Sequence, residues 1–213
     1  MNNLFEIKVC GINDKISMKT AINCKVDYIG LVFYQNSPRN ITINACKKLL
    51  DLRNKTSKIV ALTVNPVDDF LYEIKKIVKP DYFQLHGEEN PNRCQDIKKK
   101  LNVPLIKSIN VKNKVDLIRS TKQFEDICDI LLLDAPSETL PGGNGKKFDW
   151  EILKGYKSKK KWMLAGGLNI DNINMAIDVT NAPAIDISSG LEIKKGKKDP
   201  KLIEDFVTKC KNL

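Results

Sequence analysis

The sequence predicts an α/β protein, a single-domain (β/α)8 barrel over residues 1–213, and three observations lead to that prediction. Short apolar segments that suit strands recur along the whole chain. Segments with helical spacing lie between them, which implies parallel strands joined by helical crossovers. Eight such units within 213 residues fit a closed barrel.

The expected strands, in chain order, are residues 5–10, 28–33, 58–64, 82–86, 104–109, 130–134, 162–166 and 184–188. The first of them alternates between an apolar and a polar face: Phe5, Ile7 and Val9 share one side, and Glu6, Lys8 and Cys10 share the other. We expect the apolar side to pack on helices. The polar side then points into the barrel, with Cys10 at its mouth.

Two helix starts are marked by a capping residue followed by proline, at Asn65-Pro66 and at Asp199-Pro200. After Pro200, apolar side chains recur on one helical face, so the last helix is expected to pack on the sheet. That face holds Leu202, Ile203, Phe206, Val207 and Cys210.

A doubly wound open sheet is the structural alternative to a barrel. Such a sheet usually carries a glycine-rich dinucleotide-binding motif early in the chain, and no G-x-G-x-x-G follows the first expected strand. No low-complexity linker divides the chain. Both observations favour the barrel.

The chain carries a formal net charge of +10, which raises the question of a nucleic-acid partner. Its densest lysine runs, residues 157–162 and 194–198, are not interleaved with the aromatic side chains of a base-stacking surface. We interpret them as solvated surface and predict no nucleic-acid partner. A basic binding module with salt-sensitive affinity for RNA or DNA is the non-enzyme alternative.

Six cysteines and one histidine are present, without any C-x-x-C pair. A Cys/His zinc site and a disulfide scaffold are therefore not expected. The start of the chain lacks the pattern of a signal peptide, and no segment is apolar for long enough to span a membrane. We expect a cytoplasmic protein with reduced thiols, no metal and no membrane partner.

Reactive and glycine residues gather at the expected carboxyl ends of the strands, which form the functional face of such barrels. Each has a simpler explanation when taken alone, as a buried thiol, a capping carboxylate or a turn. Their recurrence at six strand ends indicates an active site. The candidates are Cys10, Arg39, His86, Asp134, Gly143, Gly166, Gly167, Asp186, Ser188 and Ser189.

The segments "AGGLN" and "DISSG" follow the last two strands and predict a phosphate site. Gly166 and Gly167 let backbone N–H groups approach an anion, and the loops after strands seven and eight often bind phosphate in barrels. Arg39 suits bidentate binding of a carboxylate, although a surface ion pair explains it equally well. The predicted partner is a small phosphorylated substrate, and if Arg39 binds ligand, that substrate carries a carboxylate at its other end.

Several motifs, in this order, resemble those of the phosphoribosylanthranilate isomerases of tryptophan biosynthesis: "KVCGIND", "GLVFYQNSPRNI", "VNP", "FQLHGEE", "LLLDA", "GGNGKKFDW", "LAGGLNIDNI" and "DISSGLEIKKGKKD". The resemblance runs from about residue 6 to the C-terminus. It implies a (β/α)8 barrel without metal or organic cofactor. We expect a monomer or a homodimer, and the sequence does not distinguish the two. The resemblance also implies an Amadori rearrangement that turns an aminoaldose phosphate into an aminoketose phosphate.

The same resemblance suggests roles for the candidates. Cys10 matches the general base, Asp134 the general acid, and Arg39 the residue associated with the anthranilate carboxylate. The other candidates would bind substrate. Lys8, two residues before Cys10 on the same face, is a hypothetical source of positive charge that would lower the pKa of the thiol.

Three other phosphate-binding barrels are weighed against this interpretation. A metal-dependent pentose-phosphate epimerase needs several histidine ligands, and the chain has one histidine. Indole-glycerol-phosphate synthase needs a lysine acid at a strand end, and the third expected strand ends without one. A histidine-pathway isomerase uses an aspartate where Cys10 stands.

Overall fold

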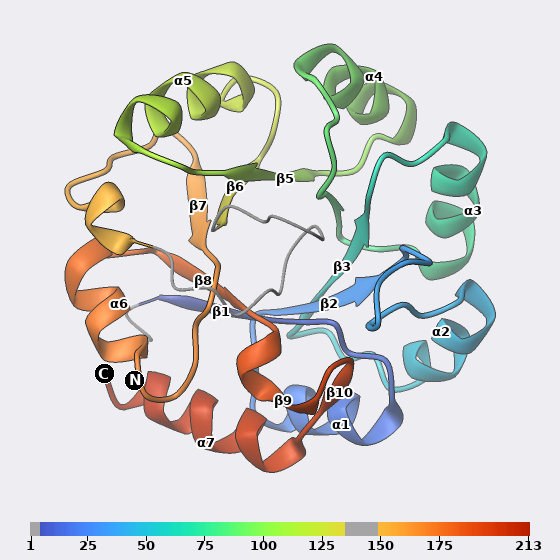
Figure 1. The fold of residues 1–213 in the computed structure, drawn as a ribbon. Coiled ribbons are helices and arrows are strands. Elements are labelled where there is room, and N and C mark those ends of the chain that lie inside the picture. Colours follow the sequence, from blue (N-terminus) through green and yellow to red (C-terminus); the bar gives the residue numbers. More distant parts are fainter. Residues whose placement is uncertain (1–4, 135–148) are drawn as a thin grey trace.

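The computed structural model describes residues 5–134 and 149–213, and its centre is a closed barrel of eight parallel strands. The strands follow one another around the barrel in chain order, as Figure 1 shows. The predicted barrel is therefore confirmed, and each expected strand is present to within two residues. The strands are β1 (Glu6–Cys10), β2 (Tyr28–Val32), β3 (Lys58–Thr63), β4 (Tyr82–Leu85), β5 (Leu105–Asn110), β6 (Ile130–Asp134), β7 (Lys161–Leu164) and β8 (Ala184–Ile187).

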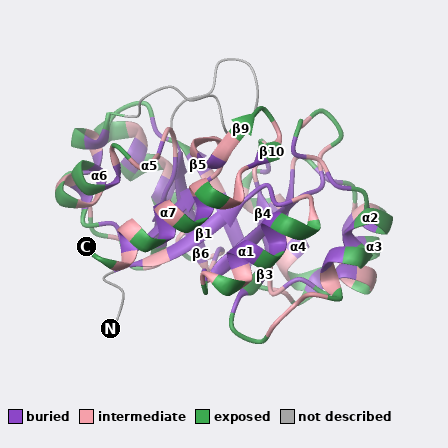
Figure 2. Ribbon diagram, turned by 90° about the horizontal axis from the view of Figure 1, so that it is seen from below, coloured by how far each residue is buried: buried purple, intermediate pink, exposed green. Residues whose placement is uncertain are grey.

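Helices surround the barrel and bury their apolar faces against the outer side of the strands (Figures 1 and 2). They are α1 (Lys15–Asn23), α2 (Ile43–Leu50), α3 (Asp68–Val78), α4 (Pro91–Leu101), α5 (Lys114–Phe124), α6 (Ile173–Thr180) and α7 (Pro200–Lys211). Two short 3₁₀ helices, η1 (Trp150–Leu153) and η2 (Ser189–Leu191), and a hairpin of β9 (Glu192–Lys194) and β10 (Lys197–Lys198) complete the described part. None of the helices described is long and apolar enough to cross a bilayer.

The alternation in the first strand directs its side chains as predicted. Ile7 and Val9 are buried in the layer between strands and helices. Lys8 is fully buried on the opposite face and binds a side chain of β8, and Cys10 packs with side chains from the ends of β2 and β3. A separate apolar cluster that includes Tyr28 fills the inside of the barrel below them. The polar face of β1 thus supplies groups to the interior.

The two predicted helix starts have different outcomes. Asp199 caps α7 by accepting a hydrogen bond from the Lys201 backbone, and Pro200 is the first helical residue, as predicted. The prediction at Asn65 is wrong, because α3 begins at Asp68. Asn65 has a φ of 47°, and its side chain accepts a hydrogen bond from the Glu88 backbone N–H. It joins the loops that follow β3 and β4, and does not cap a helix.

Pairing between the first and the last strand closes the barrel. In the register of β1 and β8, Lys8 stands beside Asp186 and Val9 stands beside Ile187. On the other side of β1, Cys10 stands beside Gly30 of β2. Segments that are far apart in the sequence, around residues 10, 30 and 187, therefore meet at one rim of the barrel.

Candidate active site

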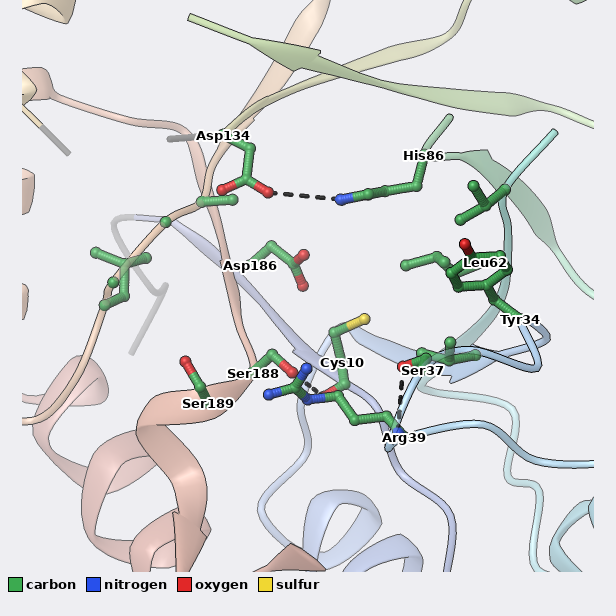
Figure 3. Close-up of a pocket in the computed structure, with 16 residues that line it drawn as sticks. Cys10, Tyr34, Ser37, Arg39, Leu62, His86, Asp134, Asp186, Ser188 and Ser189 are labelled. Atoms are coloured by element: carbon green, nitrogen blue, oxygen red, sulfur yellow. Dashed lines mark hydrogen bonds and ion pairs between the residues drawn. The ribbon is translucent and has the colours of Figure 1, made fainter. Parts of the chain in front are cut away.

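A pocket opens at the carboxyl ends of the strands. It collects every predicted site residue that the structure describes, and Figure 3 shows the labelled side chains among them around a common space. Gly143 lies outside the described residues. The predicted residues that line the pocket are Cys10, Arg39, His86, Asp134, Gly166, Gly167, Asp186, Ser188 and Ser189. Lining residues that were not predicted are Val32, Tyr34, Ser37, Leu62, Val64, Ala165 and Leu168.

Cys10 ends β1 on the inner face, 4% exposed, in contact with Val32 and Leu62. Gly30, its neighbour on β2, makes room for the thiol, since a Cβ at position 30 would lie 2.8 Å from Sγ. Burial raises the pKa of the Cys10 thiol, and the positive charge of Lys8 opposes this shift without cancelling it. Lys8 thus acts in the predicted direction, but the net pKa shift of the thiol is upward.

Lys8 and Asp186 form an ion pair inside the barrel, with 2.8 Å between Nζ and Oδ1. Burial alone would lower the pKa of Lys8, but the charges of Asp186 and Cys10 outweigh it and the pKa is raised. The lysine therefore stays cationic although no part of it reaches solvent. The Lys8 ammonium group thus places a fixed positive charge inside the barrel, near the Cys10 thiol.

Asp134 ends β6, is 6% exposed, and faces His86 across the pocket. The distance between His86 Nε2 and Asp134 Oδ2 is 3.5 Å (Figure 3). The Gln84 side-chain amide, one step deeper in β4, lies 2.9 Å from His86 Nδ1 and donates to it. Nε2, the other nitrogen of the same ring, faces the carboxyl group.

The predicted phosphate loops are glycine-rich and packed on each other. Gly166 and Gly167 have φ values of 90° and 69°, which glycine adopts without steric cost. At Gly190 a Cβ would collide with the Leu168 carbonyl, so the loops after β7 and β8 are in close contact. The Ser188 hydroxyl donates to the Cys10 carbonyl over 3.0 Å, which ties the last loop to the end of β1.

Arg39 lies in the pocket wall and is already paired with a carboxylate. Its Nε and Nη2 donate to the two carboxylate oxygens of Glu192 over 2.6 and 2.9 Å. Its aliphatic stem crosses the backbone at Gly11, where a Cβ would lie 2.7 Å from Arg39 Cδ. Gly11 has a φ of 83°, so a side chain there would be strained as well as crowded. Of the two explanations weighed for Arg39, the ion pair is present, although it is buried and not on the surface, and binding of a substrate carboxylate stays a prediction.

Glu192 and Lys198 are the functional candidates that the sequence did not reveal. The interpretation of residues 194–198 as a solvated lysine run holds for Lys194, Lys195 and Lys197 but is wrong for Lys198, which is 2% exposed. Lys198 Nζ donates to Glu192 over 2.8 Å and to the Ser188 carbonyl over 2.9 Å. The sequence "GKKD" does not distinguish Lys197 from Lys198, because the conformation of the hairpin determines which of the two side chains points inward.

Residues 5–134 and 149–213 contain no group of three or more His, Cys, Asp or Glu side chains placed to hold a metal ion. All six cysteines, among them Cys10, are free thiols. The pocket offers the Cys10 thiol, the Asp134 carboxyl group with a histidine beside it, the Asp186 carboxylate, an arginine, and two glycine-rich loops. Those groups suit proton transfer on a bound anion.

Comparison with known proteins gives one consistent result. A family model described as N-(5'phosphoribosyl)anthranilate (PRA) isomerase matches residues 7–209. The N-(5'-phosphoribosyl)anthranilate isomerase of Rhizobium rhizogenes is 40% identical over 204 residues, which cover 94% of this chain and 91% of that protein. The enzyme of the same name from Parvibaculum lavamentivorans is 36% identical, covering 97% and 98% of the two chains.

Solved structures agree with the sequence comparison. The crystal structure of phosphoribosyl anthranilate isomerase from Thermotoga maritima superposes with a TM-score of 0.88, at 30% identity, covering 98% of this chain and 100% of that one. A second isomerase structure, in complex with reduced 1-(o-carboxyphenylamino)-1-deoxyribulose 5-phosphate, has a TM-score of 0.85 at 29% identity, with coverage of 98% and 100%.

Proposed function

This chain belongs to the N-(5'-phosphoribosyl)anthranilate isomerase family, and we propose how its pocket performs the reaction of that family. The protein isomerises N-(5'-phosphoribosyl)anthranilate to 1-(2-carboxyphenylamino)-1-deoxyribulose 5-phosphate in tryptophan biosynthesis. The observation that carries the proposed mechanism is the meeting of Cys10 and Asp134, from β1 and β6, in one pocket with Arg39 and the glycine-rich loops.

The substrate is held at its two charged ends. The phosphate binds the loops after β7 and β8, where Gly167 and Ser189 face the pocket and backbone N–H groups can approach it closely. The anthranilate carboxylate binds Arg39, which gives a planar, bidentate contact. Two anchors at opposite ends fix the sugar ring between them, and that positioning supplies part of the rate enhancement.

Asp134 acts as the general acid. In its protonated form it gives a proton to the furanose ring oxygen, so that the C1–O bond breaks and a Schiff base forms between C1 and the anthranilate nitrogen. Burial of the carboxyl group at 6% exposure and the His86 imidazole, whose Nε2 lies 3.5 Å from Asp134 Oδ2, suit an acid that exchanges its proton within the pocket.

Cys10 acts as the general base. As a thiolate it removes the proton from C2 of the Schiff base, which gives an enolamine with a hydroxyl group on C2. The Cys10 thiol then returns a proton to C1, the C2 hydroxyl gives its proton to the Asp134 carboxylate, and C2 becomes the carbonyl of the ketose. No atom or electron is gained from outside, so the step needs no oxidant or reductant. Lys8 supports the thiolate by charge, because its effect on the pKa of Cys10 is downward.

The experiment that tests this function follows the loss of phosphoribosylanthranilate fluorescence in the presence of the purified protein. We expect catalysed loss at a rate proportional to enzyme concentration. Circular dichroism of the same protein preparation should show a cooperative thermal transition. If the folded protein does not consume phosphoribosylanthranilate, the proposed function is wrong.

Quaternary structure and location stay predictions. A Thermotoga maritima relative is described as dimeric, with a TM-score of 0.84 to this chain. For this chain we propose a monomer or a homodimer in the cytoplasm, and the free state of all six thiols supports a reducing compartment. Light scattering after gel filtration would give the oligomeric state.

A further inference from the structure

The β9–β10 hairpin lies on the loops that follow β1 and β2 (Figure 1). At its turn, the Gly196 carbonyl accepts a hydrogen bond from the Asn13 side chain over 3.1 Å. Gly196 has a φ of 82°, and a Cβ there would collide with the Pro38 carbonyl, next to Arg39. The hairpin is therefore packed on the loop that carries Arg39.

Two hairpin side chains point inward, and they are charged. The side chains of Glu192 and Lys198 are 4% and 0% exposed, whereas Ile193 is exposed. Burial raises the pKa of Glu192, but hydrogen bonds and charges from Arg39 and Lys198 outweigh it, and the pKa is lowered. Glu192 is therefore an anion at neutral pH, enclosed between two cations.

Glu192 occupies one defined edge of the Arg39 guanidinium. A guanidinium presents donors along two bidentate edges, Nε with Nη2 and Nη1 with Nη2. Glu192 takes the first edge with both oxygens, and Gly196 N donates to its Oε2 over 3.1 Å. The second edge has no hydrogen-bond partner within residues 5–134 and 149–213 and belongs to a residue that lines the pocket.

Lys198 links this pair to the phosphate loop. Its ammonium group donates to Glu192 Oε1, to the Ser188 carbonyl and to the Ser188 hydroxyl, at 2.8, 2.9 and 3.1 Å. An ammonium has three donors, so all of them are used within the protein. Lys198 is thereby fixed as a bridge and is not left to bind ligand itself.

We propose that Glu192 is a positioning residue, which with Lys198 fixes the Arg39 guanidinium so that its Nη1/Nη2 edge receives the carboxylate of the substrate. This inference rests on the proposed function, since it assigns the carboxylate to Arg39. It adds a specificity determinant that lies behind the pocket wall, because Glu192 does not itself line the pocket.

A different role for Glu192, adjustment of the local charge, makes the opposite prediction. If the orientation of Arg39 did not matter, removal of the negative charge of Glu192 would leave the charges of Arg39 and Lys198 uncompensated. The protein would then bind a carboxylate more tightly. If orientation decides, the loss of the bidentate contact frees the guanidinium to rotate and weakens carboxylate binding. The sign of the change therefore separates the two roles.

The test compares two fragments of the substrate, benzoate and inorganic phosphate, by NMR titration of the protein amides. The variants are Glu192→Gln, which removes the charge, and Glu192→Asp, which keeps the charge but is too short to keep both contacts. Glu204→Gln is the matched control, because Glu204 is exposed on α7. Fragment binding is measured without turnover, so the result does not depend on the catalytic assay.

We expect both Glu192 variants to weaken benzoate binding about ten- to hundredfold, the range of a charged hydrogen-bonded contact, and to leave phosphate binding within about threefold. The KM for phosphoribosylanthranilate should rise more than kcat falls. Four results would each overturn the proposal. Two of them concern both ligands or the shorter side chain: a Glu192 variant that binds both benzoate and phosphate more weakly, or a Glu192→Asp variant that binds benzoate as tightly as the wild type. The other two are tighter benzoate binding by Glu192→Gln and a wild type that does not bind benzoate. Absence of turnover with these fragment results intact would count against the proposed function alone.

Discussion

The acidity of the Cys10 thiol is set by burial and by charges on its own strand, β1, and on the adjacent β8. Burial raises its pKa, Lys8 lowers it, and Asp186 raises it. Lys8 and Asp186 are bound to each other at 2.8 Å, so a change in either one alters both contributions. A thiol with a raised pKa is mostly protonated in the free enzyme at neutral pH, and the cationic Schiff base would favour its ionisation during turnover.

The first prediction concerns this charge balance. Lys8→Met should move the titration of Cys10 to higher pH, because it removes a cation, and Asp186→Asn should move it to lower pH, because it removes an anion. The rate of iodoacetamide alkylation at Cys10, measured by peptide mass spectrometry over a pH series, reports the thiolate. Shifts in the same direction, or none in either variant, would show that these charges do not set the acidity of the thiol.

The second prediction concerns the space beside the thiol. Gly30→Ala places a methyl group 2.8 Å from Sγ, and this contact forces Cys10 or the β2 backbone to move. We expect a loss of about 1–3 kcal/mol in the free energy of unfolding and a fall in kcat well beyond the change in KM. Urea unfolding and steady-state kinetics on one preparation measure both. Unchanged kcat would mean that the placement of the thiol tolerates displacement.

The β9–β10 hairpin contributes a pH-dependent part of the stability. Glu192 has a lowered pKa in the folded protein, so its contribution is complete above the pKa of an unfolded glutamate, about 4.3, and is lost as the pH falls through the lower folded value. Glu192→Gln should remove this component. The third prediction is that the difference in unfolding free energy between wild type and variant shrinks as the pH falls below about 4. A difference that stays constant down to pH 3 would contradict it.

Helix starts show what local sequence decides and what it leaves open. Asp199-Pro200 and Asn65-Pro66 both read as a capping residue before proline, and only the first begins a helix there. At Asn65 the side chain and the backbone N–H are engaged by Glu88 and Glu89 of the next loop. A tertiary contact outweighs a local capping signal, and that contact is absent from the sequence window around Asn65.

Closure of the barrel between β1 and β8 brings the pocket together from both ends of the chain. The strands were predictable because periodicity and apolar runs are local, and the alternation in β1 was enough to direct Lys8 and Cys10 inward. The pocket followed from one geometric rule, since the carboxyl ends of parallel barrel strands share a face. The recurrence of unusual residues at those ends located nine of the ten candidates in one pocket, and the tenth, Gly143, lies outside the described residues.

Long-range pairs and net electrostatics were not predictable in the same way. Arg39 and Glu192 are 153 positions apart, and Glu192 sits in a hairpin that resembles a surface lysine run in sequence. The net pKa shift of Cys10 depends on how completely the folded barrel excludes water, which residue types do not reveal. These features arise from the packing of segments that are distant in the sequence, so only the three-dimensional structure reveals them.

The most direct test of the central claim, that Cys10 and Asp134 are the base and the acid of the isomerisation, is the steady-state kcat of Cys10→Ala and Asp134→Asn with phosphoribosylanthranilate. Each variant should lose at least about two orders of magnitude in kcat, the usual contribution of a general acid or base, with KM changed little and the thermal transition retained. A folded variant of either residue that keeps kcat within a few-fold of the wild type would contradict the assignment.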